Sequence, residues 1–162
     1  MSDNTDMVTL QRLLRQCRRI AVVGVSNDWN RPSHFVAKYL LAHGYTLIPV
    51  NPKYRTVLGQ PCYPDLATAH REQGPIDVVD CFRRSSDIEP IARDAIAIGA
   101  RCLWMQLGVI NQPAAELARA AGLTVVMDRC VKIEHARLFG GLGWAGVNTG
   151  IVSAKRPRQL PY

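Results

Sequence analysis

Short apolar runs alternate with longer amphipathic stretches along this chain. Five runs, at 19–25, 45–50, 76–81, 101–105 and 124–127, have the length and residue types of buried strands. After Arg19 the first run is continuously apolar and contains Gly24, which is typical of a central parallel strand covered on both faces. The second run is closed by Asn51-Pro52, because a proline cannot continue a central strand.

The stretches between these runs have helical spacing and helix-end signals. Helices are predicted at 32–43, from Asp65 to about Gly74, from Ser85 or Ser86 to just before Gly99, and from Pro113 to just before Gly122. The first fifteen or so residues predict a preceding helix whose apolar positions are Val8, Leu10, Leu13 and Leu14. Beyond the fifth run the pattern gives way to a glycine-rich loop and a basic tail.

Regular alternation of strand and helix predicts one α/β domain of the Rossmann-like, doubly wound class. We expect a five-stranded, mainly parallel sheet with helices on both faces and the strand order 3-2-1-4-5. The organisation expected along the chain is a helix at 1–18 packed on the domain, the Rossmann-like domain at 19–138, and a Gly-rich segment with a basic C-terminal tail at 139–162.

Composition limits the class of protein. The 162 residues are 48% hydrophobic and 20% charged, which is globular, and no apolar run is long enough to span a bilayer. The polar, acidic start does not resemble a signal peptide, so a cytoplasmic location is expected. The cysteines are widely spaced and form no C-x-x-C pair, so neither a disulfide framework nor a metal site is predicted; they are Cys17, Cys62, Cys81, Cys102 and Cys130.

Charge gives the first indication of a ligand. Lys and Arg number 20 against 13 Asp and Glu, a net charge of +7. Lys155, Arg156 and Arg158 belong to the tail, where the simplest interpretation is a solvated basic segment. The mild positive balance of the remainder fits a phosphorylated small molecule, and nucleic acid is not the expected partner.

The loop after the first predicted strand carries a partial phosphate-binding pattern. A dinucleotide fingerprint requires G-x-G-x-x-G, and only Gly24 is present. Ser26 and Asn27 can instead donate hydrogen bonds to phosphate oxygens, and Arg31 supplies a planar cation. The alternative is a longer loop that Ser33 merely caps.

The loop after the second strand differs from that of NAD-binding domains. Those domains carry a carboxylate here to hold the ribose, whereas this chain has Asn51-Pro52-Lys53. A lysine attracts a phosphate, which argues against NAD and leaves NADP allowed by charge. Alternatively, Lys53 is an ordinary solvated lysine.

Arginines follow the third predicted strand. Arg83 and Arg84 precede a helix start, where an arginine opposes the helix dipole unless an anion is bound nearby. The alternative, which the sequence favours equally, is that both arginines pair with Asp77, Asp80 or Asp87.

The last two loops offer little catalytic chemistry. Gln106 can hydrogen-bond a ligand but cannot act as an acid or base at neutral pH. Cys130, Glu134 and His135 suggest a nucleophile or a metal site, but their spacing matches no zinc pattern. The favoured interpretation is that Cys130 packs while Glu134 and His135 brace the loop. No catalytic residue is therefore assigned.

Taken in order, the motifs resemble those of a known family. They are Val23 to Ser26, Arg31-Pro32-Ser33, Val50 to Lys53, Phe82-Arg83-Arg84, Gln106 to Val109, and Met127 to Cys130 continuing to Glu134-His135. Between about residues 19 and 138 the chain resembles the small stand-alone bacterial coenzyme A-binding domain proteins. These are similar to the nucleotide-binding domain of the succinyl-CoA synthetase alpha subunit.

The resemblance implies that coenzyme A lies along the carboxyl edge of the sheet. Carried over by position, the phosphate-binding turn would be Gly24, Val25, Ser26 and Asn27. Asn51, Pro52 and Lys53 would flank the nucleotide, and Phe82 and Arg83 would contact it from the third loop. Met105 and Gln106 would approach the pantetheine arm.

The chain departs from the synthetase in two respects. Its turn has fewer glycines, and 162 residues leave no room for a second domain with a phosphorylated histidine. The expected function is non-catalytic binding of coenzyme A or an acyl-CoA, as a sensor or carrier module. The alternatives are an NADP-dependent enzyme, a CoA-thiol enzyme using Cys130, and a regulatory module whose segment 140–150 and tail contact a protein partner; a homo-oligomer is also possible.

Overall fold

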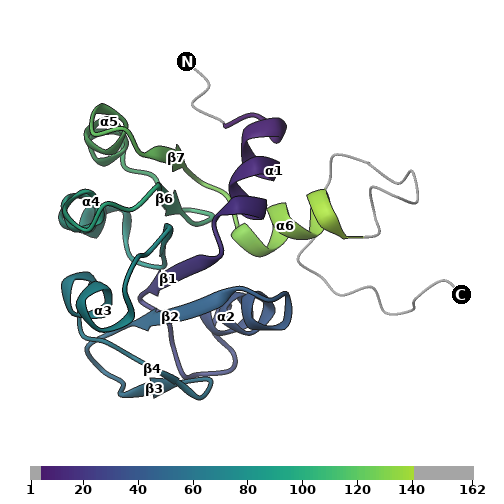
Figure 1. Cartoon of the computed structure of the whole chain (residues 1–162), viewed down its shortest axis with the longest axis vertical. Helices are drawn as coiled ribbons and strands as arrows, with labels where there is room; N and C mark the ends of the chain where they lie inside the picture. Colours follow the sequence, from purple (N-terminus) through teal and green to yellow (C-terminus); the bar gives the residue numbers. More distant parts are fainter. Residues whose placement is uncertain (1–4, 141–162) are drawn as a thin grey trace, which may run out of the picture.

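The computed structural model describes residues 5–140, which are built around a five-stranded parallel sheet (Figure 1). Its strands are β1 (Arg19–Val23), β2 (Thr46–Val50), β5 (Val78–Cys81), β6 (Cys102–Met105) and β7 (Thr124–Val126). All four strand pairs are parallel. The predicted Rossmann-like α/β class is confirmed, and each strand lies where an apolar run predicted it.

The predicted strand order is wrong. The observed order is β2-β1-β5-β6-β7, so the third predicted strand lies beside the first, with Ile20 opposite Val78 and Val23 opposite Cys81. β2 is therefore an edge strand of the sheet rather than an internal one. Pro49 in β2 explains this placement, because a proline lacks the N–H that an internal strand must donate.

A small hairpin follows the exposed edge of β2. It consists of β3 (Thr56–Val57) and β4 (Gln60–Pro61), which are antiparallel and were not predicted. Tyr63, just beyond it, donates its N–H to the Pro49 carbonyl at 3.0 Å and accepts from the Asn51 N–H at 2.9 Å. The free edge of β2 is thereby partly covered.

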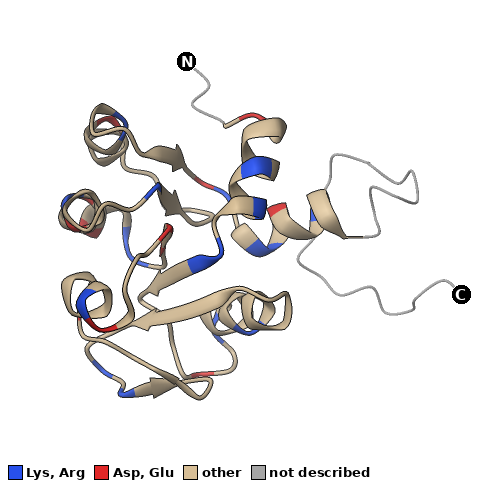
Figure 2. Ribbon diagram, viewed as in Figure 1, with Lys and Arg blue, Asp and Glu red and all other residues tan. Residues whose placement is uncertain are grey.

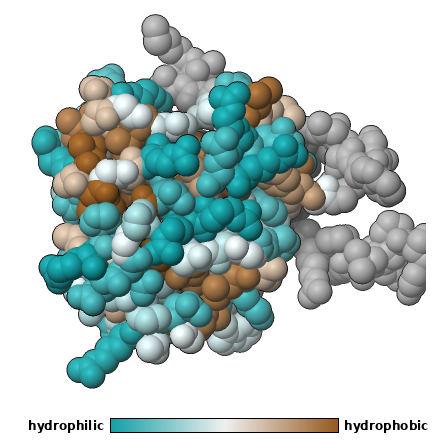
Figure 3. Space-filling model, viewed as in Figure 1, coloured by the Kyte–Doolittle hydropathy of each residue, from teal (hydrophilic) through white to brown (hydrophobic). Residues whose placement is uncertain are grey.

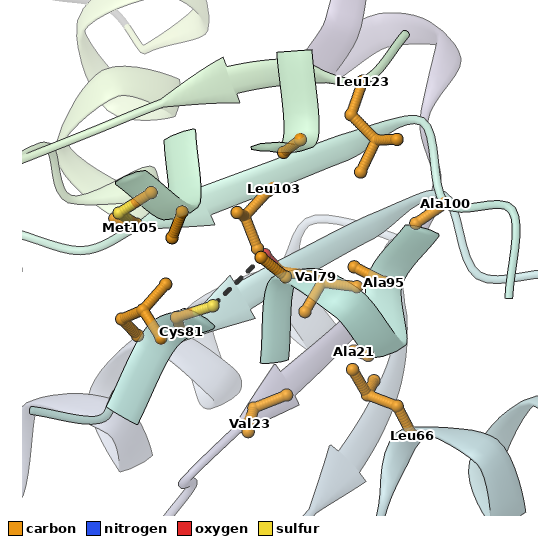
Figure 4. Close-up of a cluster of buried hydrophobic side chains, with 14 of the residues drawn as sticks. Ala21, Val23, Leu66, Val79, Cys81, Ala95, Ala100, Leu103, Met105 and Leu123 are labelled. Atoms are coloured by element: carbon orange, nitrogen blue, oxygen red, sulfur yellow. Dashed lines mark hydrogen bonds between the residues drawn. The ribbon is translucent and has the colours of Figure 1, made fainter. Parts of the chain in front are cut away.

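Helices cover both faces of the sheet, as predicted (Figure 1). One layer holds α3 (Leu66–Gln73), α4 (Ile88–Ala97) and α5 (Gln112–Ala120), packed on a core that includes Val79, Leu103 and Met105 (Figure 4). The other layer holds α1 (Met7–Gln16), α2 (Pro32–Ala42) and α6 (Val131–Phe139), packed on a second core that includes Val22 and Trp104. No helix in the described range is long and apolar enough to span a bilayer.

Helix α6 corrects the prediction of a loop after the fifth strand. Val131 is fully buried, and Leu138 and Phe139 pack against the same core as α1 and α2. These apolar side chains are what hold the segment as a helix rather than a loop. Most of the predicted Gly-rich segment and tail lies outside the described residues, so the predicted boundaries of the three segments remain predictions.

Of two helix starts that were predicted from a capping side chain, one is confirmed and the other is wrong. Asp65 caps α3 by accepting from the Thr68 N–H at 2.7 Å. Neither Ser85 nor Ser86 caps α4, which is preceded by a 3₁₀ turn, η1 (Ser85–Asp87). The Ser85 hydroxyl instead accepts from the N–H of Ile110 at 3.0 Å and joins the loops after β5 and β6.

The molecular surface is mainly hydrophilic on the face seen in Figure 3, where hydrophobic side chains gather in separate patches. Two of the exposed large apolar residues, Trp29 and Leu107, belong to the loops after β1 and β6. Val8 of α1, expected on the packed face, is also exposed, because the buried stripe of α1 is Leu10, Leu13 and Leu14.

Candidate ligand-binding site

A pocket of about 940 Å³ opens at the carboxyl ends of the central strands. The chain leaves β1 toward β2 on one side and later returns across β1 to β5, so the direction of the connections reverses between β1 and β5. Ligands of open α/β sheets bind at this reversal. The pocket is lined from the loops after β1, β2, β5 and β6 and from the first turns of α2 and α6.

Gly24 allows the loops after β1 and β5 to meet. Its φ is +86°, and a Cβ at this position would lie 2.2 Å from the Phe82 carbonyl oxygen and 3.1 Å from Nε of Arg83. The Phe82 N–H also donates to the Val23 carbonyl at 2.8 Å. Only glycine fits here, and the Arg83 side chain consequently lies against bare backbone at the predicted phosphate turn.

Ser33 fixes the remainder of that turn. Its hydroxyl, in the first turn of α2, accepts from the N–H of Ser26 at 3.0 Å. The Ser26 hydroxyl in turn accepts from the N–H of Asp28 at 3.0 Å. Ser33 does not cap α2, whose N-cap is Arg31 without a side-chain hydrogen bond, but it ties the loop to the helix, and both serines also line the pocket.

Asn51 joins the loops after β1 and β2. This buried side chain donates to the Val25 carbonyl at 2.8 Å and accepts from the Lys53 N–H at 3.0 Å. The amide therefore holds Lys53 at the pocket wall, where its side chain is exposed.

Cations line the pocket from three loops: Arg31, Lys53, Arg83 and Arg84. Nε of Arg84 forms an ion pair with Oδ2 of Asp87 at 3.2 Å, and Nε of Arg31 lies 3.9 Å from Oδ2 of Asp28. Lys53 and Arg83 form no ion pair within residues 5–140. The alternative of aspartate pairing therefore holds for Arg84 and fails for Arg83. Figure 2 shows that basic residues also lie on other elements, among them the helices.

Of the fourteen predicted binding residues, ten line the pocket: Gly24, Ser26, Arg31, Ser33, Asn51, Lys53, Phe82, Arg83, Arg84 and Gln106. The other four do not. Val25 and Met105 are fully buried in the two cores, Pro52 is exposed beside the pocket, and the Asn27 side chain donates to the Thr56 carbonyl at 3.0 Å. A strand-end residue can face either side of the sheet, which the sequence alone did not resolve for Met105.

The apolar wall of the pocket was not predicted from the sequence. Val36 of α2, Val109 after β6 and Ile133 of α6 line it, with Leu107 and Tyr54 nearer its rim. Apolar helix positions look the same in a sequence whether they face a core or a pocket. No signal separated Val36 or Ile133 from ordinary core residues.

A buried carboxyl lies behind the pocket and was considered only as an arginine partner. Asp80 is fully buried, and its Oδ1 accepts a hydrogen bond from the Gln106 side-chain N–H, so of the three aspartates that the alternative offered to Arg83 and Arg84, Asp80 pairs with neither arginine. Burial raises the pKa of Asp80 from its ordinary 3.8 to about 7, against a lowering by the Gln106 hydrogen bond. Its Oδ2 has no hydrogen-bond partner among the described residues.

Cys130, Glu134 and His135 do not converge on one site. Cys130 lines the pocket, whereas Glu134 pairs with Arg137 and Arg129, and His135 bonds the Tyr39 hydroxyl at 2.7 Å. Burial raises the pKa of the Cys130 thiol, although N–H groups at the start of α6 lower it. Across residues 5–140, no three His, Cys, Asp or Glu side chains cluster closely enough to hold a metal ion.

Comparison with known proteins supports the predicted resemblance. The model of a family described as "CoA binding domain" matches residues 18–136. The protein YneT of Bacillus subtilis (strain 168) is 37% identical over 133 residues, which is 82% of this chain and 96% of YneT. The ADP-forming acetate–CoA ligase I of Archaeoglobus fulgidus is 28% identical over 130 residues, which is 74% of this chain but 18% of the ligase.

A solved structure is also similar to this chain. A hypothetical protein from Pyrococcus horikoshii OT3 matches with a TM-score of 0.81 and 38% identity, covering 86% of this chain and 96% of that one. The family match includes every sheet strand and all four loops that build the pocket. This chain therefore belongs to the CoA binding domain family.

Proposed function

We propose that the pocket between the carboxyl ends of β1 and β5 binds coenzyme A, and that the protein is a binding module rather than an enzyme. One observation carries the proposal: Arg83, a cation without an ion pair in the described chain, lies against the bare backbone of Gly24 in this pocket. Family membership and the match to part of an acetate–CoA ligase support coenzyme A as the ligand.

The mouth of the pocket suits phosphates. Lys53 and Arg83 approach from different loops, and the N–H groups at the start of α2 add a partial positive charge. Arg83 has a planar guanidinium suited to bidentate contact with phosphate oxygens. The phosphates of coenzyme A would replace the counterions that these cations otherwise require.

The inner wall suits the pantetheine arm. It is formed by the aliphatic side chains of Val36, Val109 and Ile133, with Gln106 as a buried amide among them. A volume of about 940 Å³ is at the upper end of the range for small-molecule pockets. A long, flexible arm that is apolar except for its amides fits such a wall.

A catalytic role lacks a suitable nucleophile or acid–base pair. The Cys130 thiol has a raised pKa and is protonated at neutral pH, unlike an activated cysteine nucleophile. Glu134 is engaged by Arg129 and Arg137, away from the pocket lining. We therefore favour a sensor or carrier of coenzyme A over a CoA-thiol enzyme.

Calorimetric titration with coenzyme A, 3′-dephospho-coenzyme A, NADP and NAD tests the proposal. We expect saturable binding of coenzyme A, weaker binding of the dephospho form, and no binding of NAD. NADP is the informative competitor, since Lys53 occupies the position of the ribose-binding carboxylate. Binding of NADP without coenzyme A would replace the proposal with a nicotinamide-nucleotide protein.

A further inference from the structure

Asp80 is a buried carboxyl that the fold does not require. It lies in β5, the middle strand of the sheet, with Val22 and Trp104 as its cross-strand neighbours. Val78, two residues earlier on the same face, is an ordinary core residue. A carboxyl buried in this position with one unpartnered oxygen is costly, and an aliphatic side chain would avoid that cost.

Asp80 does not itself line the pocket, but two of its neighbours, Gln106 and Cys130, do, so its carboxyl lies directly behind the part of the wall that they form. Gln106, which lines the pocket, donates its side-chain N–H to Oδ1 of Asp80. The Trp104 indole N–H donates to the Arg129 carbonyl at 2.7 Å and so holds the start of α6 over this part of the sheet. Cys130, the next residue, also lines the pocket and is close enough for the Asp80 charge to raise its pKa.

Asp80 has no positively charged group among its titratable neighbours in the described residues. From β5 and β6 the neighbouring titratable groups are the thiols of Cys81 and Cys102, and from the start of α6 the thiol of Cys130. All three thiols have raised pKa values and are neutral near pH 7. No Lys, Arg or His of the described chain affects the pKa of Asp80. Only the Gln106 amide stabilises its charge.

We propose that Asp80, held in place by Gln106, is a ligand-binding residue whose free oxygen accepts a hydrogen bond from an N–H or S–H group of the bound molecule. The inference rests on the proposed function, because coenzyme A would bring such groups to this end of the pocket: the pantetheine amides and the terminal thiol. The phosphates would remain at the mouth, beside Arg83 and Lys53.

Proton release on binding follows from this contact. In the free protein the Asp80 carboxyl, with a pKa of about 7, is partly protonated at neutral pH. A donor from the ligand favours the ionised form, so binding near pH 7 expels a fraction of a proton. The coenzyme A phosphates, whose second pKa is about 6, also lose part of a proton when they bind cations near pH 7. If Asp80 were merely buried, without ligand contact, the native protein and an Asp80→Asn variant would therefore release the same amount.

The experiment is calorimetric titration of the full chain with coenzyme A at pH 7 in buffers of different ionisation enthalpy, which reports proton release. The variants are Asp80→Asn and, as a matched control, Asp77→Asn, whose carboxyl bonds the N–H groups of Arg18 and Arg19 at the opposite sheet edge. We expect release from the native protein and from Asp77→Asn. Asp80→Asn should release fewer protons than these two proteins, because only the phosphate contribution remains, and should bind coenzyme A about tenfold to a hundredfold more weakly.

A second ligand identifies the donor group. Acetyl-CoA lacks the S–H but keeps the amides. If native protein releases more protons than Asp80→Asn with both ligands, the contact is to an amide; if it does so with coenzyme A alone, the contact is to the thiol. Equal proton release and equal affinity for coenzyme A in native protein and Asp80→Asn overturn the inference while leaving the proposed function intact. Absence of coenzyme A binding by the native protein overturns both.

Discussion

Asp77 and Asp80 lie three residues apart, and their surroundings differ completely. Asp77, just before β5 at the amino edge of the sheet, accepts from the N–H groups of Arg18 and Arg19 at 3.1 and 3.0 Å. Asp80, near the carboxyl edge, has one amide donor and an unpartnered oxygen. The fold explains the first carboxyl as a link between the chain entering β1 and that entering β5. The fold gives no comparable role to the second carboxyl, Asp80, for which we have proposed a contact with the ligand.

The two edges of the sheet show the same contrast on a larger scale. Near the amino edge, the hydroxyl of Tyr45 donates to the Leu14 carbonyl at 2.6 Å, and the hydroxyl of Tyr39 bonds His135. The rings of Tyr39, Tyr45 and His43 pack around His135. These two hydroxyls and the His135 nitrogen are satisfied within the protein. The carboxyl edge instead keeps a pocket, unpaired cations and an unpartnered carboxyl oxygen.

Ionisation of Asp80 should change the stability of the fold more than any other change considered below. A carboxyl whose pKa rises from 3.8 to about 7 on folding stabilises the native state fully below pH 3.8, and that contribution is lost as the pH rises through 7. At about 1.4 kcal/mol per pKa unit, the native protein should lose about 4 kcal/mol of unfolding free energy over this range relative to Asp80→Asn. Urea unfolding at pH 4, 6 and 8 measures the difference. If the unfolding free energies of the native protein and Asp80→Asn change in parallel with pH, Asp80 is not the group that titrates.

The opposite pH dependence is expected at the other edge. Burial, with the charges of His43 and Arg18, lowers the pKa of His135 from 6.5 to about 4. Its contribution to stability is therefore complete above pH 6.5 and is lost as the pH falls through 4, by up to about 3 kcal/mol. His135→Gln, which cannot be protonated, should lose less stability in acid than the native protein in the same urea series. An unchanged acid slope in the variant would show that His135 is not the group responsible.

Arg83 and Arg84 differ in the same way within the pocket, because only Arg84 has an ion-pair partner. Removal of the unpaired cation by Arg83→Gln should weaken coenzyme A binding by about 2 kcal/mol, a typical value for a charge-assisted hydrogen bond. Arg84→Gln should cost less, since that side chain is exposed and already paired with Asp87. Arg93→Gln on α4, outside the pocket, serves as the control. Equal losses at Arg83 and Arg93 would indicate a general charge effect instead of a site.

The smallest effect is expected at Lys53. Its side chain is exposed, so Lys53→Glu should change the unfolding free energy by no more than about 0.5 kcal/mol. Coenzyme A binding should nevertheless weaken by about 1 kcal/mol or more, because a charge at the pocket wall is reversed. Urea unfolding and calorimetry on one preparation separate the two quantities. Native affinity in this variant would mean that Lys53 is merely solvated.

The sequence predicted those parts of the fold that depend on local patterns. Strand positions followed from apolar runs, and the cap at Asp65 followed from residue type. Strand order did not follow, although Pro49 indicated an edge strand and could have corrected it. Helix α6 was missed because its stabilising contacts, through Val131 and Leu138, are made with distant helices rather than within the segment.

The candidate site also has parts that local sequence patterns predicted and parts that they did not. Loops at strand ends could be placed by rule, so Gly24, Arg83 and Gln106 were predicted together and lie together. The bond between Gln106 and Asp80 joins residues 26 positions apart and depends on the register of β5 and β6. No local pattern encodes that register.

The most direct test is a crystal structure of the protein soaked with coenzyme A. We expect the phosphates beside Gly24 and Arg83, and the pantetheine arm running along Val36 and Ile133 toward Gln106. Coenzyme A bound elsewhere, for example near His135 at the amino edge, or a pocket that stays empty at saturating ligand, would contradict the account.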